Sequence, residues 1–360
     1  MIESISIRNF KAIHELLDVP MAQVTLITGA NNTGKTSLLE AIDLSRQLQD
    51  PQASIRSLGM RGQRPLPSNP ADLWAPLFAD FDAAQEIRID STERVHGEEK
   101  VENASFAMSF KTDSKMLMAP GPNAVHERGP DSELLPGRLE VEAEWAQGYF
   151  RGSHSITAAG NLQLFIESLQ QAKSTRGNSI LVHAGNTIGD PESMAFGQLE
   201  RDNKTGELVA LLQRLEPAIQ DLALIPIQNK AVLHVDVGLK TKIPIHQMGR
   251  GLHRLVSFAL ATMILPGAIA LIDEIENGIY YEQMKSIWQG LVTTSKANGG
   301  QIIATTHSFE CIAAAWEALS EMGSKDFQLL RLERDKNGIR AVPMDADDIQ
   351  VFLDSGWEAR

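Results

Sequence analysis

Residues 29–37, with the sequence GANNTGKTS, combine the residue types that bind a nucleotide phosphate chain. An apolar run at 24–28 precedes them and a helical pattern follows, which is the strand, turn and helix context of a phosphate-binding loop. Glycines let backbone N–H groups approach phosphate oxygens, Lys35 adds positive charge for the β- and γ-phosphates, and the Thr36 hydroxyl can ligate Mg²⁺. The predicted nucleotide-binding residues here are Gly29, Ala30, Asn31, Asn32, Thr33, Gly34, Lys35, Thr36 and Ser37.

Two later apolar stretches end in polar residues that could reach the same nucleotide. Asp273 and Glu274 follow the apolar residues of AIALIDEIENG, and His307 follows those of QIIATTHS. If these stretches are neighbouring parallel strands, their carboxyl ends lie at one edge of the sheet, where ligands bind. Asp273 would then hold Mg²⁺ through a water molecule, opposite Thr36, and Glu274 would accept a proton from an attacking water or orient it. His307 would hydrogen-bond the γ-phosphate.

Each of these residues also has a simpler interpretation. A pair of adjacent carboxylates is usually a solvated loop, and a single histidine at a strand end is usually structural. The prediction of a catalytic site therefore depends on their combination with a phosphate-binding loop in one chain.

The pattern of the remaining chain predicts the elements that would position these residues. Strand-like stretches occur at 1–28, 86–90, 104–111, 139–145, 232–237 and 242–245, and helical spacing at 162–169, 208–215, 252–263 and 284–291. Apolar strands that alternate with helices in the C-terminal third predict a parallel sheet. The two helical stretches between 158 and 225 predict a helical lid, which divides the chain into 1–157, 158–225 and 226–360.

The composition is that of an ordinary globular protein, with 43% hydrophobic and 22% charged residues. The sequence has no run of 18 apolar residues and no secretory signal, so we expect a cytoplasmic protein that does not cross a membrane. The single cysteine, Cys311, excludes an intramolecular disulfide and a cysteine-cluster zinc site. The net charge of −13 disfavours tight binding of nucleic acid. We expect any such binding to be weak, non-specific and confined to a local cluster such as Arg56, Arg61 and Arg64.

Taken in order, GANNTGKTS, MGRGLHRL, ALIDEIENG and ATTHS resemble the motifs of an ABC-type ATPase head, and they cover most of the chain together with the N-terminal ISIRNFKAIHEL. More narrowly, the chain resembles ATPases of the overcoming-lysogenisation-defect (OLD) type and is similar to RecF and SMC heads. The signature motif departs from the family pattern, because Gly249, Arg250 and Gly251 stand in place of a serine followed by two glycines. Gln63 and Gln85 are the candidates for the family's glutamine loop, but a surface glutamine is the favoured interpretation of each.

The resemblance implies an α/β fold of the ABC-type P-loop NTPase head, with a mixed central sheet, an antiparallel β-subdomain and an inserted helical lid. Residues 1–157 would hold the Walker A motif and the β-subdomain, residues 158–225 the lid, and residues 226–360 the signature, the Walker B motif and the histidine switch. The resemblance also implies a homodimer or higher homo-oligomer in which Gly249, Arg250 and Gly251 of each subunit complete the partner's ATP site.

The resemblance further implies a dimeric, ATP- and Mg²⁺-dependent switch that controls a separately encoded effector, a nuclease or toxin, in phage defence. A RecF-like DNA-repair ATPase is the alternative. A GTPase is disfavoured because no guanine-recognition motif is visible, and a kinase because a glycine-led helix directly precedes the acidic strand. Fused OLD proteins carry a TOPRIM nuclease domain after the ATPase, and the residues after His307 are expected to be too few for one. Asp345, Asp347 and Asp348 resemble a two-metal motif, but a solvated acidic loop is the favoured interpretation.

Overall fold

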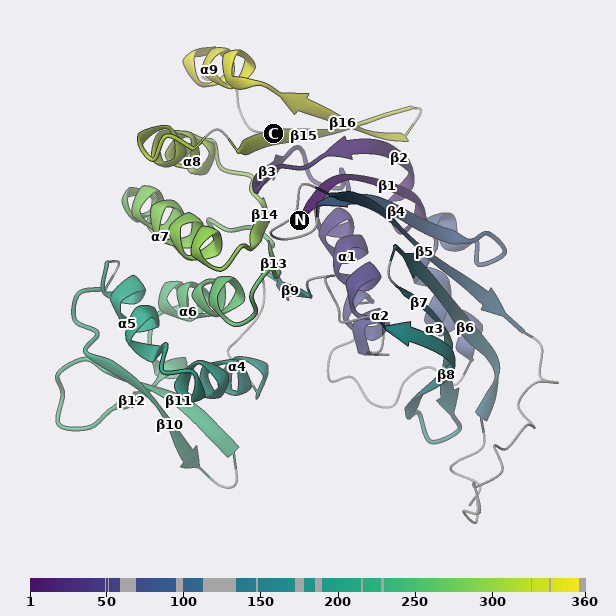
Figure 1. The fold of residues 1–360 in the computed structure, drawn as a ribbon, viewed down its shortest axis with the longest axis horizontal. Helices are drawn as coiled ribbons and strands as arrows, with labels where there is room; N and C mark the ends of the chain where they lie inside the picture. Colours follow the sequence, from purple (N-terminus) through teal and green to yellow (C-terminus); the bar gives the residue numbers. More distant parts are fainter. Residues whose placement is uncertain are drawn as a thin grey trace.

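The computed structural model describes residues 1–48, 50, 52–58, 69–94, 100–112, 134–146, 148–171, 178–184, 190–214, 216–227, 230–324, 326–336 and 338–355. Two large sheets and the helices between and around them make up most of these residues (Figure 1). No helix in these ranges is both long and apolar enough to span a membrane.

The first sheet is antiparallel and has seven strands in the order β2-β1-β4-β5-β6-β7-β8. Its strands are β1 (Ile2–Phe10), β2 (Ile13–Pro20), β4 (Ile87–Arg94), β5 (Val101–Lys111), β6 (Leu134–Trp145), β7 (Gly148–Thr157) and β8 (Leu162–Gln171). In β4 the side chains alternate between buried Ile87 and Ile89 and more exposed Arg88 and Asp90, which is the pattern of a sheet with one face on the core.

The second sheet has six strands in the order β16-β15-β3-β14-β13-β9 and is parallel except for β16. Its strands are β3 (Val24–Thr28), β9 (Ser179–Val182), β13 (Ile269–Ile272), β14 (Gln301–Thr305), β15 (Phe327–Asp335) and β16 (Gly338–Met344). The central strands β3, β13 and β14 are buried along their whole length, because helices cover both faces of a parallel sheet. Leu26 therefore belongs to one apolar core, and the next residue, Ile27, to the other.

Helices separate the two sheets and cover the outer face of the parallel one. α1 (Lys35–Arg46) lies on the face that is turned towards the seven-stranded sheet, whereas α6 (Arg250–Met263), α7 (Met284–Ala297) and α8 (Phe309–Glu321) line the opposite face (Figure 1). The side chain of Gln301 joins the two sheets, because its amide bonds the backbone of Ile2 as donor and acceptor and donates to the Ala22 carbonyl, each at 2.8 Å.

The remaining elements are short or lie at the periphery. A three-stranded sheet, in the order β10-β11-β12, packs with α4 and α5 beside α6. These elements are α4 (Asp190–Arg201), α5 (Thr205–Gln213), β10 (Asp221–Ile227), β11 (Lys230–Asp236) and β12 (Ile243–Pro244). The others are α2 (Gln52–Ser57), α3 (Pro70–Trp74), α9 (Ala346–Ser355) and the 3₁₀ turns η1 (Ala75–Leu77), η2 (Ala79–Phe81), η5 (Ile245–Gln247) and η6 (Tyr281–Gln283).

The α/β class with a mixed central sheet and an antiparallel β-subdomain is confirmed. The helix predicted at 162–169 is wrong, because these residues form β8, which pairs along its length with β7. Leu162, Leu164 and Ile166 alternate as a strand requires, whereas the helical interpretation used the spacing of Leu162, Phe165, Ile166 and Leu169. The helix at the second predicted stretch is confirmed as α5, so only part of 158–225 is helical.

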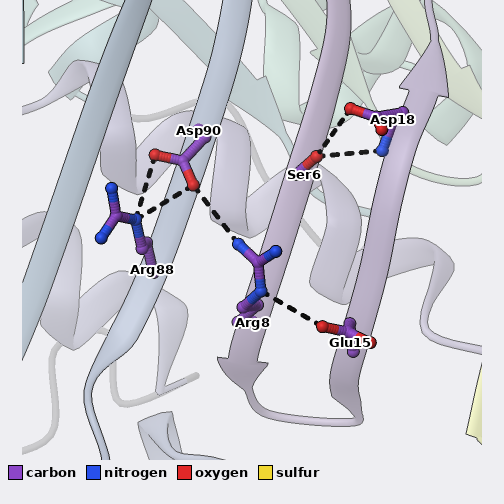
Figure 2. Close-up of polar contacts among 6 residues, drawn as sticks. All are labelled: Ser6, Arg8, Glu15, Asp18, Arg88 and Asp90. Atoms are coloured by element: carbon purple, nitrogen blue, oxygen red, sulfur yellow. Dashed lines mark hydrogen bonds and ion pairs between the residues drawn. The ribbon is translucent and has the colours of Figure 1, made fainter.

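The face of the seven-stranded sheet that is turned away from the core is polar and ion-paired (Figure 2). Arg8 contacts Glu15 at 3.2 Å and Asp90 at 3.5 Å, and Arg88 contacts Asp90 at 3.1 Å. Asp18 and Ser6 are hydrogen-bonded nearby. A groove of about 540 Å³ crosses this face, and it is lined by Ser4, Ser6, Asp18, Arg88, Asp90, Ser91, Thr92, Asn103, Ala104, Ser105, Glu144, Trp145 and Ala146.

Candidate functional site

The predicted phosphate-binding loop connects the end of β3 to the start of α1 and has the backbone that its glycines permit. Gly29 has φ 142° and Gly34 has φ 86°, both in the region that side chains rarely adopt. A Cβ atom at Gly29 would lie 2.3 Å from the Leu332 carbonyl oxygen, and one at Gly34 would lie 2.9 Å from Ile339 Cδ1. Both positions therefore require glycine, and the loop lies directly against the β15–β16 hairpin.

Lys35 is buried under this loop and turned back onto it. Its Nζ atom donates to the carbonyl oxygens of Gly29 and Ala30, each at 2.8 Å. Burial lowers the pKa of the Lys35 ammonium, and the carboxylates of Asp273, Glu274 and Glu276 oppose that shift. The Lys35 ammonium therefore places a positive charge directly behind the loop backbone. The carboxylates of Asp273, Glu274 and Glu276, from a distant part of the chain, lie near this charge.

Asp273 and Thr36 meet, as the sequence predicts for a Mg²⁺ site. The Thr36 Oγ1 atom lies 3.2 Å from both carboxylate oxygens of Asp273, and Thr305 Oγ1 donates to Asp273 Oδ1 at 2.7 Å. This contact forms because β13, β14 and β3 are neighbours in register, so their carboxyl ends lie at one edge. A hydroxyl and a carboxylate are oxygen donors of the kind that Mg²⁺ prefers, so these residues fit the ion.

Glu274 adopts an unusual backbone conformation at this edge. Its φ of 48° is in the left-handed region, which is uncommon for a residue with a long side chain and concentrates at functional sites. Its amide nitrogen donates to Thr305 Oγ1 at 2.8 Å, and one of its carboxylate oxygens lies 3.4 Å from Asn277 Nδ2. The half-buried Glu274 side chain therefore lies beside Asp273 and is partly open to solvent.

His307 follows the same edge, two residues beyond β14. Its backbone N–H donates to Glu276 Oε1 at 2.7 Å, which fixes the loop after β14 to the turn after β13. The structure thus brings Lys35, Thr36, Asp273 and Glu274 together and places His307 next to that group. Glu276 was not among the predicted residues.

The predicted signature residues lie at the first turn of α6. Gly249 is the N-cap and Arg250 the first helical residue, and both are exposed. Gly251 packs against the turn after β13, where an added Cβ atom would lie 2.6 Å from the Gly278 carbonyl oxygen. Because no side chain caps this helix start, its first N–H groups remain available to an external acceptor.

Sequence reasoning missed Arg254, one turn further along α6. This side chain is 5% exposed, and its guanidinium donates to the carbonyl oxygens of Asp273 at 2.7 Å and Glu274 at 2.8 Å. It also donates to the carbonyls of His183 and Ala184, which follow β9. The only signal in the sequence was an arginine amid the apolar residues of GLHRLVSFAL.

The strand beside Asp273 contains neither of the two candidates for the glutamine loop. Gln85 lies in the turn before β4, where its side chain donates to Asp82 at 2.9 Å, and Gln63 lies outside the described residues. The neighbour of β13 on that side is β9, and the amide of Asp273 donates to the Val182 carbonyl at 2.9 Å. His183 and Ala184, at the end of β9, are therefore the residues that adjoin the site.

Two protein families match the sequence. Residues 1–117 match the family described as "AAA ATPase domain", and residues 161–312 match the family described as "AAA domain, putative AbiEii toxin, Type IV TA system". With the geometry above, these matches show that the chain carries AAA-type ATPase domains and is an ATPase. The narrower grouping with OLD and RecF proteins stays a prediction.

Several known proteins are similar to the chain. An "ATP/GTP phosphatase" of Helicobacter pylori (strain ATCC 700392 / 26695) is 22% identical over 356 residues, which cover 91% of this chain and 90% of that protein. The crystal structure of an SMC head bound to the C-winged helix domain of ScpA has a TM-score of 0.49 and 13% identity, with 97% of this chain and 99% of that chain covered. The SMC head domain from Thermotoga maritima has a TM-score of 0.45 and 13% identity, with 96% and 99% covered.

Proposed function

We propose that the chain is a nucleotide-controlled switch, in which ATP binding and hydrolysis regulate a separately encoded effector. The observation that carries the proposal is the contact of Thr36 with Asp273, because it unites two motifs that are far apart in the sequence over a loop built for phosphate. Such an arrangement serves positioning and charge neutralisation, which is what phosphoryl transfer requires of a protein.

In this proposal each site residue has a separate role. The backbone N–H groups of the phosphate-binding loop bind the phosphates of ATP, and Lys35 contacts the β- and γ-phosphates. The loop consists of Gly29, Ala30, Asn31, Asn32, Thr33, Gly34, Lys35, Thr36 and Ser37. Thr36 and Asp273 hold Mg²⁺, which supplies neutralisation of charge on the phosphate oxygens. Glu274 orients the attacking water and accepts its proton, since its carboxylate lies beside Asp273 and is partly open to solvent. His307 would hydrogen-bond the γ-phosphate.

The proposed switch is a dimer that encloses nucleotide between two subunits. The exposed, uncapped start of α6 at Gly249, Arg250 and Gly251 offers N–H groups and a positive dipole to the phosphates bound by the other subunit. Arg250 adds a charge at that position. An ATPase whose site is completed in this way changes its assembly state with each hydrolysis cycle, and a higher homo-oligomer is compatible with the same contact.

For the partner we favour an effector, a nuclease or toxin, in phage defence over a role in DNA repair. The description of the family matched by residues 161–312 names the AbiEii toxin of a type IV toxin–antitoxin system. This description supports an association of the chain with a toxin. The polar sheet face of Figure 2 carries Asp18, Asp90 and Glu144 with Arg88 along its groove, which disfavours this face as a phosphate-binding surface.

Turnover by single-site variants tests the assignment. We expect slow, Mg²⁺-dependent ATP hydrolysis by the parent, because Lys35, Thr36, Asp273 and Glu274 supply positioning and charge neutralisation and none of these four is an arginine finger. Lys35→Ala should lose ATP binding, whereas Glu274→Gln should bind ATP and lose at least tenfold of the turnover rate. Binding by fluorescence of mant-ATP and phosphate release would be measured in parallel. Parental hydrolysis by Glu274→Gln would show that another group activates the water.

A further inference from the structure

A single buried side chain links the start of α6 to the catalytic turn. Arg254 lies four residues after Arg250 on the same helix, and its guanidinium bonds two separate backbone segments that come from outside the helix. These segments are the turn after β13, through the carbonyls of Asp273 and Glu274, and the end of β9, through those of His183 and Ala184. Three elements are therefore joined at one group.

The environment of Arg254 suits a rigid link. The guanidinium carbon lies 4.9 Å from the centroid of the Phe258 ring, and the side chain is 5% exposed. Burial lowers the pKa of the guanidinium, and the nearby carboxylates of Asp273, Glu274 and Glu276 oppose this shift. A planar guanidinium with fixed donors holds four carbonyl oxygens in one arrangement, which an ammonium group cannot do.

The link acts on the backbone of the candidate catalytic carboxylate. The N–H of Glu274 is held by Thr305, and its C=O is held by Arg254, so both sides of this left-handed residue are fixed. The first turn of α6 also packs closely against the same loop, where Gly251 lies beside Gly278. A movement of α6 would therefore move Arg254 and change the orientation of Glu274.

We propose that Arg254 is a positioning residue that couples engagement of the α6 start by the partner subunit's nucleotide to the alignment of Glu274 in its own subunit. The inference rests on the proposed dimeric ATPase and adds a route by which dimer formation activates hydrolysis. Arg254 does not touch nucleotide in this scheme. Its loss should reduce turnover much more than ATP binding.

The first experiment separates turnover from binding in Arg254→Met, Arg254→Lys and the surface control Arg340→Met on β16. We expect both Arg254 variants to bind mant-ATP within about threefold of the parent, and Arg254→Met to lose at least tenfold in kcat. Arg254→Lys, which keeps the charge and part of the hydrogen bonding, should recover part of that loss. Parental kcat in both variants would overturn the inference, as would a loss of mant-ATP binding that equals the loss of kcat.

The second experiment is a double-mutant cycle on kcat between Arg250→Gln and Arg254→Lys, which keeps the inference testable if the Met variant does not fold. If Arg254 transmits what the α6 start senses, the double variant should be no slower than the slower single variant. Losses that multiply would show two independent effects and would overturn the coupling. A parent protein without ATP turnover would refute the proposed function itself, whereas an active parent with multiplying losses refutes the coupling alone.

Discussion

Asp273 is held by groups that come from two strands and a helix. Thr305 donates to it from β14, Thr36 approaches it from α1, and its own amide is bound by the end of β9. This arrangement fixes the carboxylate before any ligand arrives, so little reorganisation is needed when charge develops on a phosphate. The neighbouring Glu274 is less enclosed, which fits its proposed role of contacting a water molecule.

A buried histidine away from this site makes stability depend on pH. His154 on β7 is 2% exposed, and burial lowers its pKa to about 4 from a usual value of 6.5, although Asp50 acts in the opposite direction. Between these two values the unfolded chain binds a proton that the folded chain does not. The folded state should therefore lose stability as the pH falls from 6.5 to 4, by about 2 kcal/mol between pH 7 and pH 5.

Urea unfolding of the parent and of His154→Leu at pH 7 and pH 5 would measure this effect. The variant should lack about 2 kcal/mol of the parental pH dependence, since leucine binds no proton in either state. The surface histidine His14 provides the matched control, His14→Leu. Equal pH dependence of the free energy of unfolding in the parent and His154→Leu would contradict the prediction.

At the residue scale, sequence patterns predicted the groups whose chemistry depends on local context. The strand–loop–helix around Lys35 is a contiguous segment, so its glycines and its lysine could be assigned without any tertiary information. Arg254 and His154 could not be assigned, because their burial arises from segments that are distant in the sequence. The strand β9 was also not predicted, because a strand of four residues is too short to show a clear hydrophobic period in the sequence.

At the scale of elements, the start of α6 is fixed by the close approach of two backbones. We predict that Gly251→Ala destabilises the protein and lowers its unfolding temperature by about 2–5 °C, because a methyl group there would lie 2.6 Å from the Gly278 carbonyl oxygen. Gly249→Ala is the matched control, since nothing lies within 4 Å of a Cβ atom at that position. Thermal unfolding would be compared directly. Equal temperatures for the two variants would show that the turn after β13 yields without cost.

The strand β8 shows why element type can be misread from spacing alone. Its apolar residues fit both a helical and an alternating pattern over ten residues, and the bulge between Arg151 and Gly152 shifts the alternation of its partner. These residues form a strand because they pair with β7, a contact that the spacing of apolar residues within β8 does not reveal. The proposed division into 1–157, 158–225 and 226–360 therefore separates β8 from the sheet to which it belongs.

At the scale of the whole molecule, nucleotide should change the assembly state. Glu274→Gln with ATP and Mg²⁺ is expected to give a mass of at least twice 39.5 kDa by light scattering, because hydrolysis would no longer release the enclosed nucleotide. ADP should not give this increase. Glu274→Gln combined with Arg250→Glu is the control, since a carboxylate at the α6 start would repel the partner's phosphates. A monomer in ATP, or the same dimer in the control, would exclude this interface.

Nucleic acid should be a poor ligand of the described surface. The net charge of −13 opposes a phosphate backbone over the molecule as a whole. Arg61 and Arg64 of the predicted basic cluster lie outside the described residues, as does the side chain of Arg56. The weak, non-specific binding predicted from the sequence therefore stays a prediction, and any such binding should decrease steeply with salt.

We also predict that the chain has no nuclease activity of its own. Asp345 and Asp348, which resembled a metal motif, instead form a reciprocal cap at the start of α9, where each backbone N–H donates to the other's carboxylate at 3.2 and 2.9 Å. The described residues contain no group of three or more His, Cys, Asp or Glu side chains that could hold a metal ion. The expected acidic loop is thus a helix start.

Incubation of the pure protein with plasmid DNA and with RNA, in Mg²⁺ or Mn²⁺, tests this prediction. Neither substrate should be cut, with or without ATP, because two-metal cleavage requires a cluster of ligands that the α9 cap does not provide. Lys35→Ala, which should not bind ATP, shows whether any cleavage of nucleic acid depends on the ATPase cycle. Asp345→Ala should cost about 1 kcal/mol through loss of the cap and leave ATP turnover unchanged. Cleavage that persists in Lys35→Ala and disappears in Asp345→Ala would instead identify the α9 start as a nuclease centre.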